Sequence, residues 1–275
     1  MTDKQRQAAA PDGDTEPLLS ETKNAICWIT LNRPARLNAI TRQMLSALSA
    51  ALTAAAADEA TRVVVLTGSG RAFSAGQDLE EAALLQGDMA AEVARSLDAH
   101  YHPVLRQLHA LPIPVVAAVN GIAAGAGANL ALNCDLVIAA RSASFQQAFT
   151  RIGLLPDCGG TWYLPRLVGL ARAKALALLA APLAAEEALS WGLIARLAED
   201  ETFLPETRAL AEQLASGPAV AYGLTKAALD AAFDNSFEAQ LDLEAASQQR
   251  AAATADFREG LAAFKEKRAP RFRGK

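Results

Sequence analysis

The sequence predicts an α/β fold, in which a parallel sheet is covered by helices. Three observations indicate this. Short apolar runs alternate with helical patterns along the first 140 residues, Gly-containing turns follow several of these runs, and the last third is almost wholly helical in pattern. Alternation of strands and helices is typical of parallel sheets. With 275 residues, of which 52% are hydrophobic and 20% charged, the chain can bury a sizeable core.

The strands of the predicted sheet are short. They cover residues 25–31, 63–66, 114–119 and 136–139. Uninterrupted apolar runs such as Val-Val-Val-Leu at 63–66 are typical of parallel strands that are buried on both faces. Between the first two strands, Thr41 is a good N-cap for a helix that ends near Ala57. The apolar stripe of this helix consists of Met44, Leu45, Leu48 and Leu52.

The remaining predicted elements are helices. A stretch of mixed polarity covers residues 79–110, with a kink or break expected at Pro103. A short buried helix is expected at 125–133. Beyond Gly159, the predicted helices cover residues 160–180, 184–191, 203–216, 219–232, 236–251 and 254–267. We expect this C-terminal part to form a separate helical layer or an oligomerisation arm.

Composition excludes several classes of function. The net charge of −4 provides no general attraction for nucleic acid, and no apolar run reaches the ~18 residues that a membrane-spanning helix needs. The polar N-terminal residues lack the apolar centre of a signal peptide, so residues 1–17 are expected to be a disordered tail. Cys27, Cys134 and Cys158 are widely spaced, as is typical of reduced thiols. We therefore expect a cytoplasmic protein without membrane or nucleic-acid partners.

Common catalytic and metal-binding motifs are missing from the chain. It contains neither a P-loop nor the G-x-S-x-G of hydrolases. Its histidines lack metal-site spacing and are more typical of solvated or packing side chains, so we expect no metal; they are His100, His102 and His109. Gly125-Ala-Gly127 suggests a dinucleotide loop, but Leu130 replaces the final small residue and Asp135 comes too early. The chemistry must therefore depend on carboxylates and backbone N–H groups.

Two turns are placed where α/β proteins bind ligands, beyond the carboxyl ends of parallel strands. They cover Ser69–Asp78 and Asn120–Asn129, and a predicted helix follows each. Both turns can therefore present free backbone N–H groups. If each turn directed one N–H group at the same oxygen, together they would form an oxyanion hole.

One carboxylate, Asp157, lies among apolar and turn residues in the stretch GLLPDCGGTW at 153–162. A turn containing Pro156, Gly159 and Gly160 often includes an Asp, and this stretch alone favours that interpretation. Alternatively, the carboxylate points into an apolar pocket, where burial would raise its pKa and make it a useful acid or base. An oxyanion hole beside a single carboxylate suggests proton transfer next to a carbonyl group, which gives Asp157 a role that a surface turn does not explain.

Five motifs together resemble the enoyl-CoA hydratase/isomerase (crotonase) family in order and spacing. They are Asn32–Ala39, Phe73–Leu79, Ala118–Gly127, Gly153–Thr161 and Glu259–Arg268. The resemblance covers about residues 18–275 and implies a crotonase-like spiral of ββα units, at 18–200, with a C-terminal helical trimerisation region, at 201–275. It also implies an acyl-CoA thioester as substrate, with coenzyme A as part of the substrate and no separate cofactor, and a homotrimer or a dimer of trimers.

The resemblance further implies roles for individual residues. The backbone N–H groups of Ala75 and Ala126 would hold the thioester oxygen, and Asp157 would move the proton. The backbone around Arg71–Phe73 and Gln77–Leu79 would line the path of adenine and pantetheine. The implied substrate-binding residues are Arg36 at the CoA phosphates, then Phe73, Ala75, Gln77, Asp78, Leu79, Gly125 and Asn129, and Phe264 and Lys267 at the CoA of a neighbouring subunit.

The chain departs from the hydratases of this family at two positions. Those hydratases hold water between two glutamates, but by spacing Asn129 and Phe149 stand at the corresponding positions here. In this family an acid at the place of Asp157 marks isomerases. The resemblance therefore implies an isomerase that converts ring-1,2-epoxyphenylacetyl-CoA to oxepin-CoA and shifts double bonds of unsaturated acyl-CoA. The alternatives are an enoyl-CoA hydratase and a non-catalytic acyl-CoA-binding subunit; RNA binding, known in one branch, is disfavoured by the acidic composition.

Overall fold

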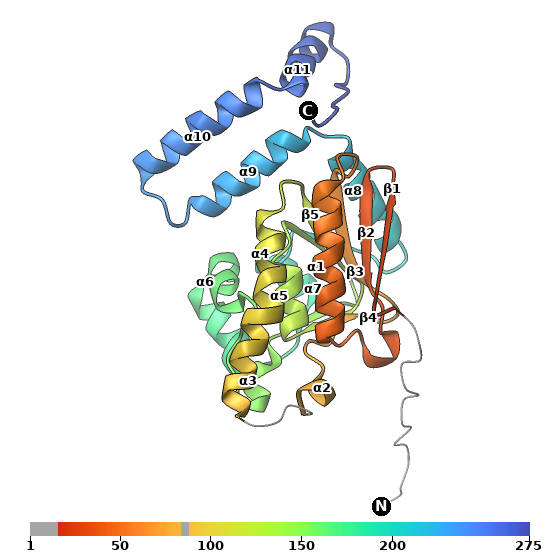
Figure 1. Ribbon diagram of the computed structural model, residues 1–275, viewed down its shortest axis with the longest axis vertical. Helices are drawn as coiled ribbons and strands as arrows, with labels where there is room; N and C mark the ends of the chain where they lie inside the picture. The colour runs from red at the N-terminus through yellow and green to blue at the C-terminus, as the bar shows by residue number, and fades with distance from the viewer. Residues whose placement is uncertain (1–15, 84–87) are drawn as a thin grey trace, which may run out of the picture.

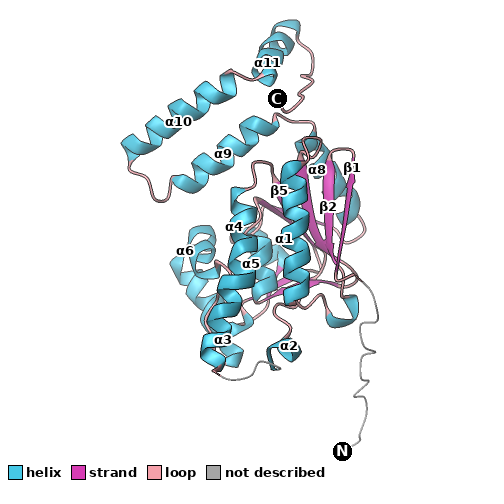
Figure 2. Ribbon diagram, viewed as in Figure 1, coloured by secondary structure: helices cyan, strands magenta, loops and turns pink. Residues whose placement is uncertain are grey.

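A computed structural model describes residues 16–83 and 88–275, and it contains two sheets surrounded by helices (Figure 1). The expected tail at 1–17 lies almost wholly outside the described residues. The larger sheet has the order β1-β2-β3-β5-β7-β10, with β1 antiparallel and the other strands parallel (Figure 2). Its strands are β1 (Leu18–Lys23), β2 (Ile26–Leu31), β3 (Val63–Gly68), β5 (Val115–Val119), β7 (Leu136–Ala140) and β10 (Arg196–Ala198).

A second, smaller sheet has the order β4-β6-β8-β9. Its strands are β4 (Ala72–Ser74), β6 (Ile122–Ala124), β8 (Ser144–Gln146) and β9 (Leu183–Ala184). Each of β4, β6 and β8 follows a strand of the larger sheet and precedes a helical segment, so the ββα unit occurs three times in succession. This is the spiral that the resemblance implies. The sequence alone predicts turns at β4 and β6, because strands of only three residues show no measurable periodicity.

The units pack closely because small residues separate them. A Cβ atom built on Gly121 would lie 2.2 Å from the Arg71 carbonyl oxygen, and one built on Gly127 would lie 2.6 Å from the Ser74 side chain. Both distances are shorter than real contacts, so β6 and α5 (Ala126–Leu132) can approach β4 only through glycine. This close approach brings the two Gly-containing turns together.

The predicted helix at 79–110 is interrupted. It consists of α2 (Leu79–Ala83), α3 (Met89–Ser96), a π-helical turn (Leu97–Tyr101) and α4 (His102–Ala110). Pro103 is the second residue of α4, where a helix needs no N–H donor from it. The widened turn just before it carries the hydrogen bond from the His102 N–H to the Leu97 carbonyl. The expected break therefore occurs immediately before the proline.

Other core helices largely follow the sequence pattern. Thr41 caps α1 (Arg42–Ala57) by accepting a hydrogen bond from the Met44 N–H at 3.1 Å, and the predicted apolar stripe is buried. The helix predicted at 160–180 is α6 (Gly160–Leu179), but it breaks at Gly169, whose φ of +77° and ψ of 159° are not helical. The remaining core elements are α7 (Ala185–Ser190), α8 (Phe203–Ala215) and the 3-10 turns η1 (Pro34–Arg36) and η3 (Ala148–Ile152).

The C-terminal helices α9 (Ala219–Ala231), α10 (Phe237–Ala252) and α11 (Ala255–Glu266) form an arm that extends from the core (Figure 1). Before the arm, α8 lies beyond the expected boundary at 201 and packs its buried residues Leu210 and Ala211 on the large sheet. The arm is joined to the core where the Lys226 ammonium lies 2.7 Å from the Asp135 carboxylate. Among the helices of the described residues, none is both long and apolar enough to cross a bilayer.

Candidate active site

The two Gly-containing turns meet at Gly76. This residue has a φ of +93°, and a Cβ atom built on it would lie 2.7 Å from the Ala124 carbonyl oxygen and 3.3 Å from the Ala126 nitrogen. Only glycine fits this contact, for steric and for conformational reasons. The chain that follows β4 therefore lies directly against the start of α5. Two backbone N–H groups, one from each turn, can point at the same oxygen only if the turns lie this close.

The donor on the first turn is not Ala75. The Ala75 N–H already donates to the Leu37 carbonyl at 2.9 Å, so the expectation that it holds the thioester oxygen is wrong. Two residues further on, Ile40 forms a parallel bridge with Gln77: the Ile40 N–H donates to the Gly76 carbonyl and the Asp78 N–H to the Ile40 carbonyl. In such a bridge the central residue directs its own N–H to the opposite side. The Gln77 N–H has no acceptor among the described residues.

On the second turn, the candidate donor that the sequence predicts is Ala126. It is the first residue of α5, and the first N–H groups of a helix have no acceptor within it. The Ala126 N–H has no acceptor elsewhere in the described ranges. The preceding residue, Gly125, is already committed, because its N–H donates to the Gln146 carbonyl at 2.8 Å. The N–H groups of Gln77 and Ala126 are thus neighbouring donors without an acceptor among the described residues.

Asp157 combines the two interpretations that the sequence leaves open. Its backbone forms a turn, in which its carbonyl accepts from the Gly160 N–H at 2.8 Å. Its side chain is the unusual part, because the buried Oδ1 atom has no hydrogen-bond partner. Burial raises the pKa of Asp157, while the Cys158 thiol and His102 lower it to a smaller extent. The turn therefore carries a carboxylate whose environment suits proton transfer.

Asn129 holds this turn instead of contacting substrate. Its side chain is 0% exposed, so the expectation that it binds substrate directly is wrong. Its Nδ2 donates to the Asp157 carbonyl at 2.8 Å, and its Oδ1 accepts from Gln147 Nε2 at 2.8 Å. A Cβ atom on Gly160 would lie 2.3 Å from the same Nδ2, so the turn fits tightly around the amide. Asn133 adds a donor to the Cys158 carbonyl at 2.9 Å.

Replacing Asn129 with alanine is expected to lower the free energy of unfolding by about 1–3 kcal/mol, because buried polar groups lose their partners. Urea denaturation measures this loss. Asn235→Ala is the matched control, since it removes an exposed amide that donates to the Gln240 side chain, and it should change stability by less than about 0.5 kcal/mol. Equal stability of the two variants would contradict the role of Asn129 as a clamp.

Phe149 stands at the second position where, by the sequence comparison above, the hydratases of this family carry an acid. Its ring lies near Gly125, on the second turn. Phe149 is buried, and a Cβ atom on Gly125 would lie 4.0 Å from its Cζ atom. With Asn129 enclosed behind the Asp157 turn, neither position offers a proton donor to the site. Asp157 is therefore the carboxylate that this arrangement presents.

Charged side chains around the first turn form ion pairs with one another. Asp78 Oδ2 lies 2.7 Å from Arg33, and its Oδ1 accepts the N–H groups of Glu80 and Glu81 at the start of α2. Burial would raise the pKa of Asp78, but the hydrogen bond from Arg33 and those of the two N–H groups lower it overall. The side chain of Asp78 therefore caps a helix and is unavailable for substrate. Arg36, expected at the CoA phosphates, forms two hydrogen bonds with the Glu80 carboxylate, at 2.7 and 2.8 Å.

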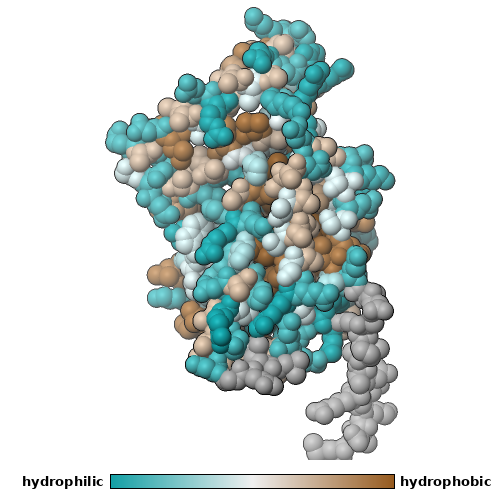
Figure 3. Space-filling model, viewed as in Figure 1, coloured by the Kyte–Doolittle hydropathy of each residue, from teal (hydrophilic) through white to brown (hydrophobic). Residues whose placement is uncertain are grey.

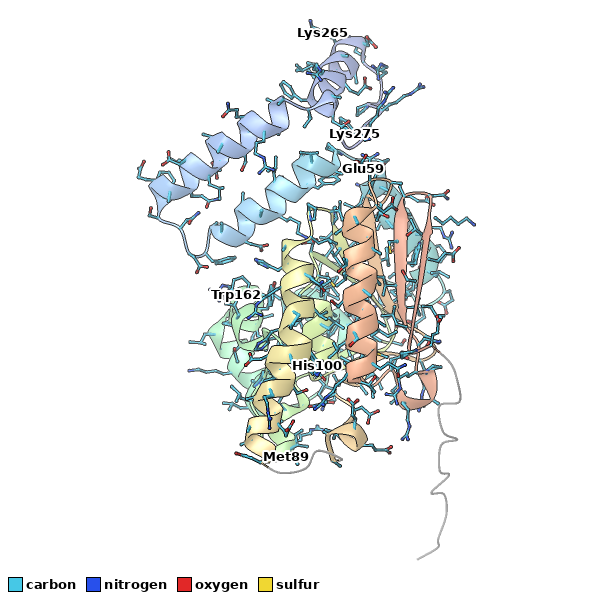
Figure 4. The ribbon with its side chains drawn as sticks, viewed as in Figure 1. Glu59, Met89, His100, Trp162, Lys265 and Lys275 are labelled. Atoms are coloured by element: carbon cyan, nitrogen blue, oxygen red, sulfur yellow. The ribbon has the colours of Figure 1, made fainter. Side chains whose placement is uncertain are left out.

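The remaining expected contacts differ in accessibility. The Phe73 side chain is fully buried in the core, so only its backbone can line a ligand path, whereas Leu79 is exposed. Phe264 is 84% exposed, and Lys267 ends α11 on the arm. Figure 4 labels Lys265 at the outer end of α11, far from His100 in the π-helical turn. Within one chain these arm residues do not reach the site, so their expected role stays a prediction about a neighbouring subunit.

A hollow of about 940 Å³ lies elsewhere, between the arm and the ends of α1 and α4. The C-terminal residues line part of it, and Lys275 returns to within 3.1 Å of Glu59 beyond the end of α1 (Figure 4). None of the residues around it belongs to the two turns or to the Asp157 turn. This hollow therefore takes no part in the candidate site.

The chain is similar to known proteins over almost its whole length. Residues 21–275 match the family model for enoyl-CoA hydratase/isomerase. The 1,2-epoxyphenylacetyl-CoA isomerase of Escherichia coli is 47% identical over 94% of this chain and 99% of its own length. A Rhodobacter capsulatus protein named "Probable enoyl-CoA hydratase" is 50% identical over 93% and 97%. The crystal structure of enoyl-CoA hydratase from Bacillus anthracis superposes with a TM-score of 0.88 at 35% identity, covering 94% of this chain and 100% of that one. The chain therefore belongs to the enoyl-CoA hydratase/isomerase family.

Proposed function

We propose that this enzyme is an acyl-CoA isomerase with Asp157 as its acid and base. One observation carries the proposal: a single buried, unpartnered carboxylate oxygen lies in a site that also offers two free backbone N–H groups. Asn129 and Phe149 support it, because neither can supply the second acid that addition of water requires. The 47% identity to an epoxyphenylacetyl-CoA isomerase supports the same class of reaction.

The proposed reaction moves a proton and leaves the composition of the substrate unchanged. The thioester oxygen accepts from the N–H groups of Gln77 and Ala126, which makes the adjacent carbon acidic. Ionised Asp157 removes a proton from this carbon, and the charge passes to the thioester oxygen as an enolate. The proton on Asp157 exchanges with solvent, Asp157 then delivers a proton to the third carbon from the carbonyl, and the double bond moves into conjugation. Asp157 is ionised again at the end, so the cycle needs no cofactor; coenzyme A enters and leaves with the acyl group.

The substrate that we propose is ring-1,2-epoxyphenylacetyl-CoA, which would become oxepin-CoA, together with unsaturated acyl-CoA whose double bond is shifted. We place the enzyme in the cytoplasm, with its acyl-CoA substrates. The relative named as a hydratase, at 50% identity, keeps enoyl-CoA hydration as the second candidate.

Three substrates in deuterated water, analysed by mass spectrometry, separate the candidates. They are crotonyl-CoA, 3-hexenoyl-CoA and enzymatically generated epoxyphenylacetyl-CoA. We expect deuterium-labelled isomers from 3-hexenoyl-CoA, oxepin-CoA from the epoxide, and no hydration of crotonyl-CoA. Rapid hydration of crotonyl-CoA would instead mean that another residue supplies an acid, which would contradict the proposal.

We also propose a homotrimer or a dimer of trimers that assembles through the arm. Large apolar side chains are exposed along α9, α10 and α11, and Figure 3 shows brown and tan residues on this part of the surface. They include Leu229, Phe233, Phe237, Leu241, Phe257, Leu261 and Phe264. Contiguous exposed apolar surface is typical of protein–protein interfaces. Light scattering after size-exclusion chromatography gives the mass, and a monomer would contradict this assembly.

A further inference from the structure

Ser74 lies between the two turns that carry the candidate oxyanion donors. It is the last residue of β4, and it is completely buried. Its Oγ atom donates to the Asn38 carbonyl at 2.8 Å and accepts the Gly76 N–H at 3.2 Å. Among the described residues, the Gly76 N–H has no other acceptor. Gln77 is the next residue in the chain, so the Ser74 hydroxyl holds the backbone from which the first donor projects.

The same side chain also contacts the second turn. Gly127 follows Ala126 at the start of α5, and a Cβ atom built on it would lie 2.6 Å from the Ser74 Cβ and 2.7 Å from its Oγ. Because glycine has no such atom, the backbone of α5 can lie directly against the Ser74 side chain. One hydroxymethyl group is therefore bonded to the first turn and packed against the second.

Asn38 fixes the position of the Ser74 hydroxyl. The Asn38 side chain is completely buried, and its Nδ2 donates to the Ala72 carbonyl at 2.8 Å and to the Ser69 carbonyl at 2.9 Å. Ala72 belongs to the same strand as Ser74, so the strand, the amide and the hydroxyl form a closed set of contacts. A side chain whose partners are all held in this way keeps a single position.

Packing alone does not explain a serine at this position. Alanine would present the same Cβ atom to Gly127, and burying a hydroxyl costs free energy unless its hydrogen bonds are made. What the hydroxyl adds over alanine is a fixed acceptor for the N–H of Gly76, a buried residue. The feature that requires serine is therefore the path of the backbone at Gly76.

We propose that Ser74 is a positioning residue that sets the separation between the N–H groups of Gln77 and Ala126. This inference rests on the proposed function, in which these two groups hold the thioester oxygen. Ser74 is buried beneath the site and does not touch the substrate. It acts on the first donor through Gly76 and on the second through Gly127. Two donors stabilise one oxyanion only when both are held at hydrogen-bond distance from the place where its charge develops.

Ser74→Ala tests this role, because it removes the hydroxyl and keeps the Cβ atom that packs against Gly127. We expect kcat for 3-hexenoyl-CoA to fall by roughly 5- to 50-fold, less than the roughly 10²–10³-fold of losing a donor outright. The value of KM should change less than about twofold, because the donors act most strongly on the charge of the enolate.

Thr207→Val is the matched control for Ser74→Ala. It also removes a completely buried hydroxyl that donates to a backbone carbonyl, that of Phe203 at 2.7 Å in α8. The control should leave kcat and KM unchanged, and urea denaturation should show a similar loss of stability in both variants. An unchanged kcat in Ser74→Ala, an equal loss of kcat in both variants, or a Ser74→Ala protein that does not fold would overturn the proposal.

A spectroscopic measurement separates this proposal from the proposed function, because it needs no turnover. Infrared difference spectra of bound phenylacetyl-CoA, isotope-labelled at the thioester carbonyl carbon, report how strongly the two N–H groups polarise the C=O bond. We expect the wild-type protein and Thr207→Val to lower the stretching frequency of this bond, and about half of the lowering to be lost in Ser74→Ala.

The outcomes of this measurement are distinct. Full lowering in Ser74→Ala would overturn the role of Ser74 and leave the proposed isomerase intact. If the wild-type protein caused no lowering, the assignment of the two donors would fail, and the role of Ser74 with it. Normal isomerisation by Asp157→Asn would overturn the proposed acid and base and leave the spectroscopic result for Ser74 to stand.

Discussion

Asp157→Asn is expected to lower the rate of isomerisation by roughly 10²–10⁴-fold, the usual contribution of a positioned acid or base. The amide keeps the size of the side chain and cannot accept the proton. The turn itself should persist, because Asn129 and Gly160 bond to the Asp157 backbone carbonyl and not to its side chain. Single-turnover exchange of deuterium into 3-hexenoyl-CoA measures the chemical step directly. Undiminished exchange in a folded variant would contradict the assignment.

The same variant should be more stable than the wild-type protein at neutral pH. Burial raises the pKa of Asp157 above its ordinary value of 3.8, so the folded state holds this proton more tightly than the unfolded state. Its contribution to stability is therefore fully present below the ordinary pKa and is lost as the pH rises through the raised pKa. We expect Asp157→Asn to gain about 1 kcal/mol at pH 7, as is common when a strained functional group is replaced, and to gain nothing at pH 3. Thermal unfolding across this range tests both values.

A second carboxylate with a raised pKa, Asp135, provides the control for these measurements. The pKa of Asp135 is also raised by burial, but Asp135 is paired with Lys226 at 2.7 Å and lies outside the site. Asp135→Asn should leave the deuterium exchange unchanged and should destabilise the protein by at most about 1 kcal/mol, because only a partly exposed ion pair with Lys226 is lost. If both variants lost activity equally, the effect of Asp157→Asn would be structural.

Gly76→Ala is expected to reduce kcat by roughly 10²–10³-fold, the effect of losing one oxyanion donor. A methyl group at this position would lie 2.7 Å from the Ala124 carbonyl and 3.3 Å from the Ala126 nitrogen. The backbone must move to relieve this contact, and the movement separates the N–H groups of Gln77 and Ala126. The KM value should change less than kcat, because the donors act most strongly on the charge of the enolate. Steady-state kinetics with 3-hexenoyl-CoA provide both values.

Gly169→Ala is the control that separates the effect of backbone strain from the effect of displacing the two N–H donors. Gly169 also has a positive φ, of +77°, but a Cβ atom there meets nothing within 4 Å. Both substitutions should therefore destabilise the fold, by about 1–2 kcal/mol of backbone strain in the control, and only Gly76→Ala should lose activity. Comparable activity of the two variants would contradict the assignment of the oxyanion donors.

The sequence by itself determined the class of fold and the family, and it singled out the carboxylate that we propose as the acid and base. These depend on local patterns: apolar runs of strand length, a capped helix after Thr41, and the motif around Asp157. It also indicated that Asn129 and Phe149 cannot act as acids, since residue type alone decides this. It could not show the three-residue strands β4, β6 and β8, because segments so short have no periodicity and form only beside their neighbours.

Only the tertiary structure decided which groups in the site are free. The Leu37 carbonyl accepts the Ala75 N–H, whereas the bridge between Ile40 and Gln77 leaves the Gln77 N–H without an acceptor among the described residues. Leu37 and Ile40 each lie more than 35 residues away in the chain from these amides. Likewise, Asn129 becomes a clamp because Gln147 and the Asp157 carbonyl meet its amide in the core. Each N–H group and each amide can satisfy only a few partners. Its function is therefore set by the contacts that folding brings to it, which no local pattern in the sequence records.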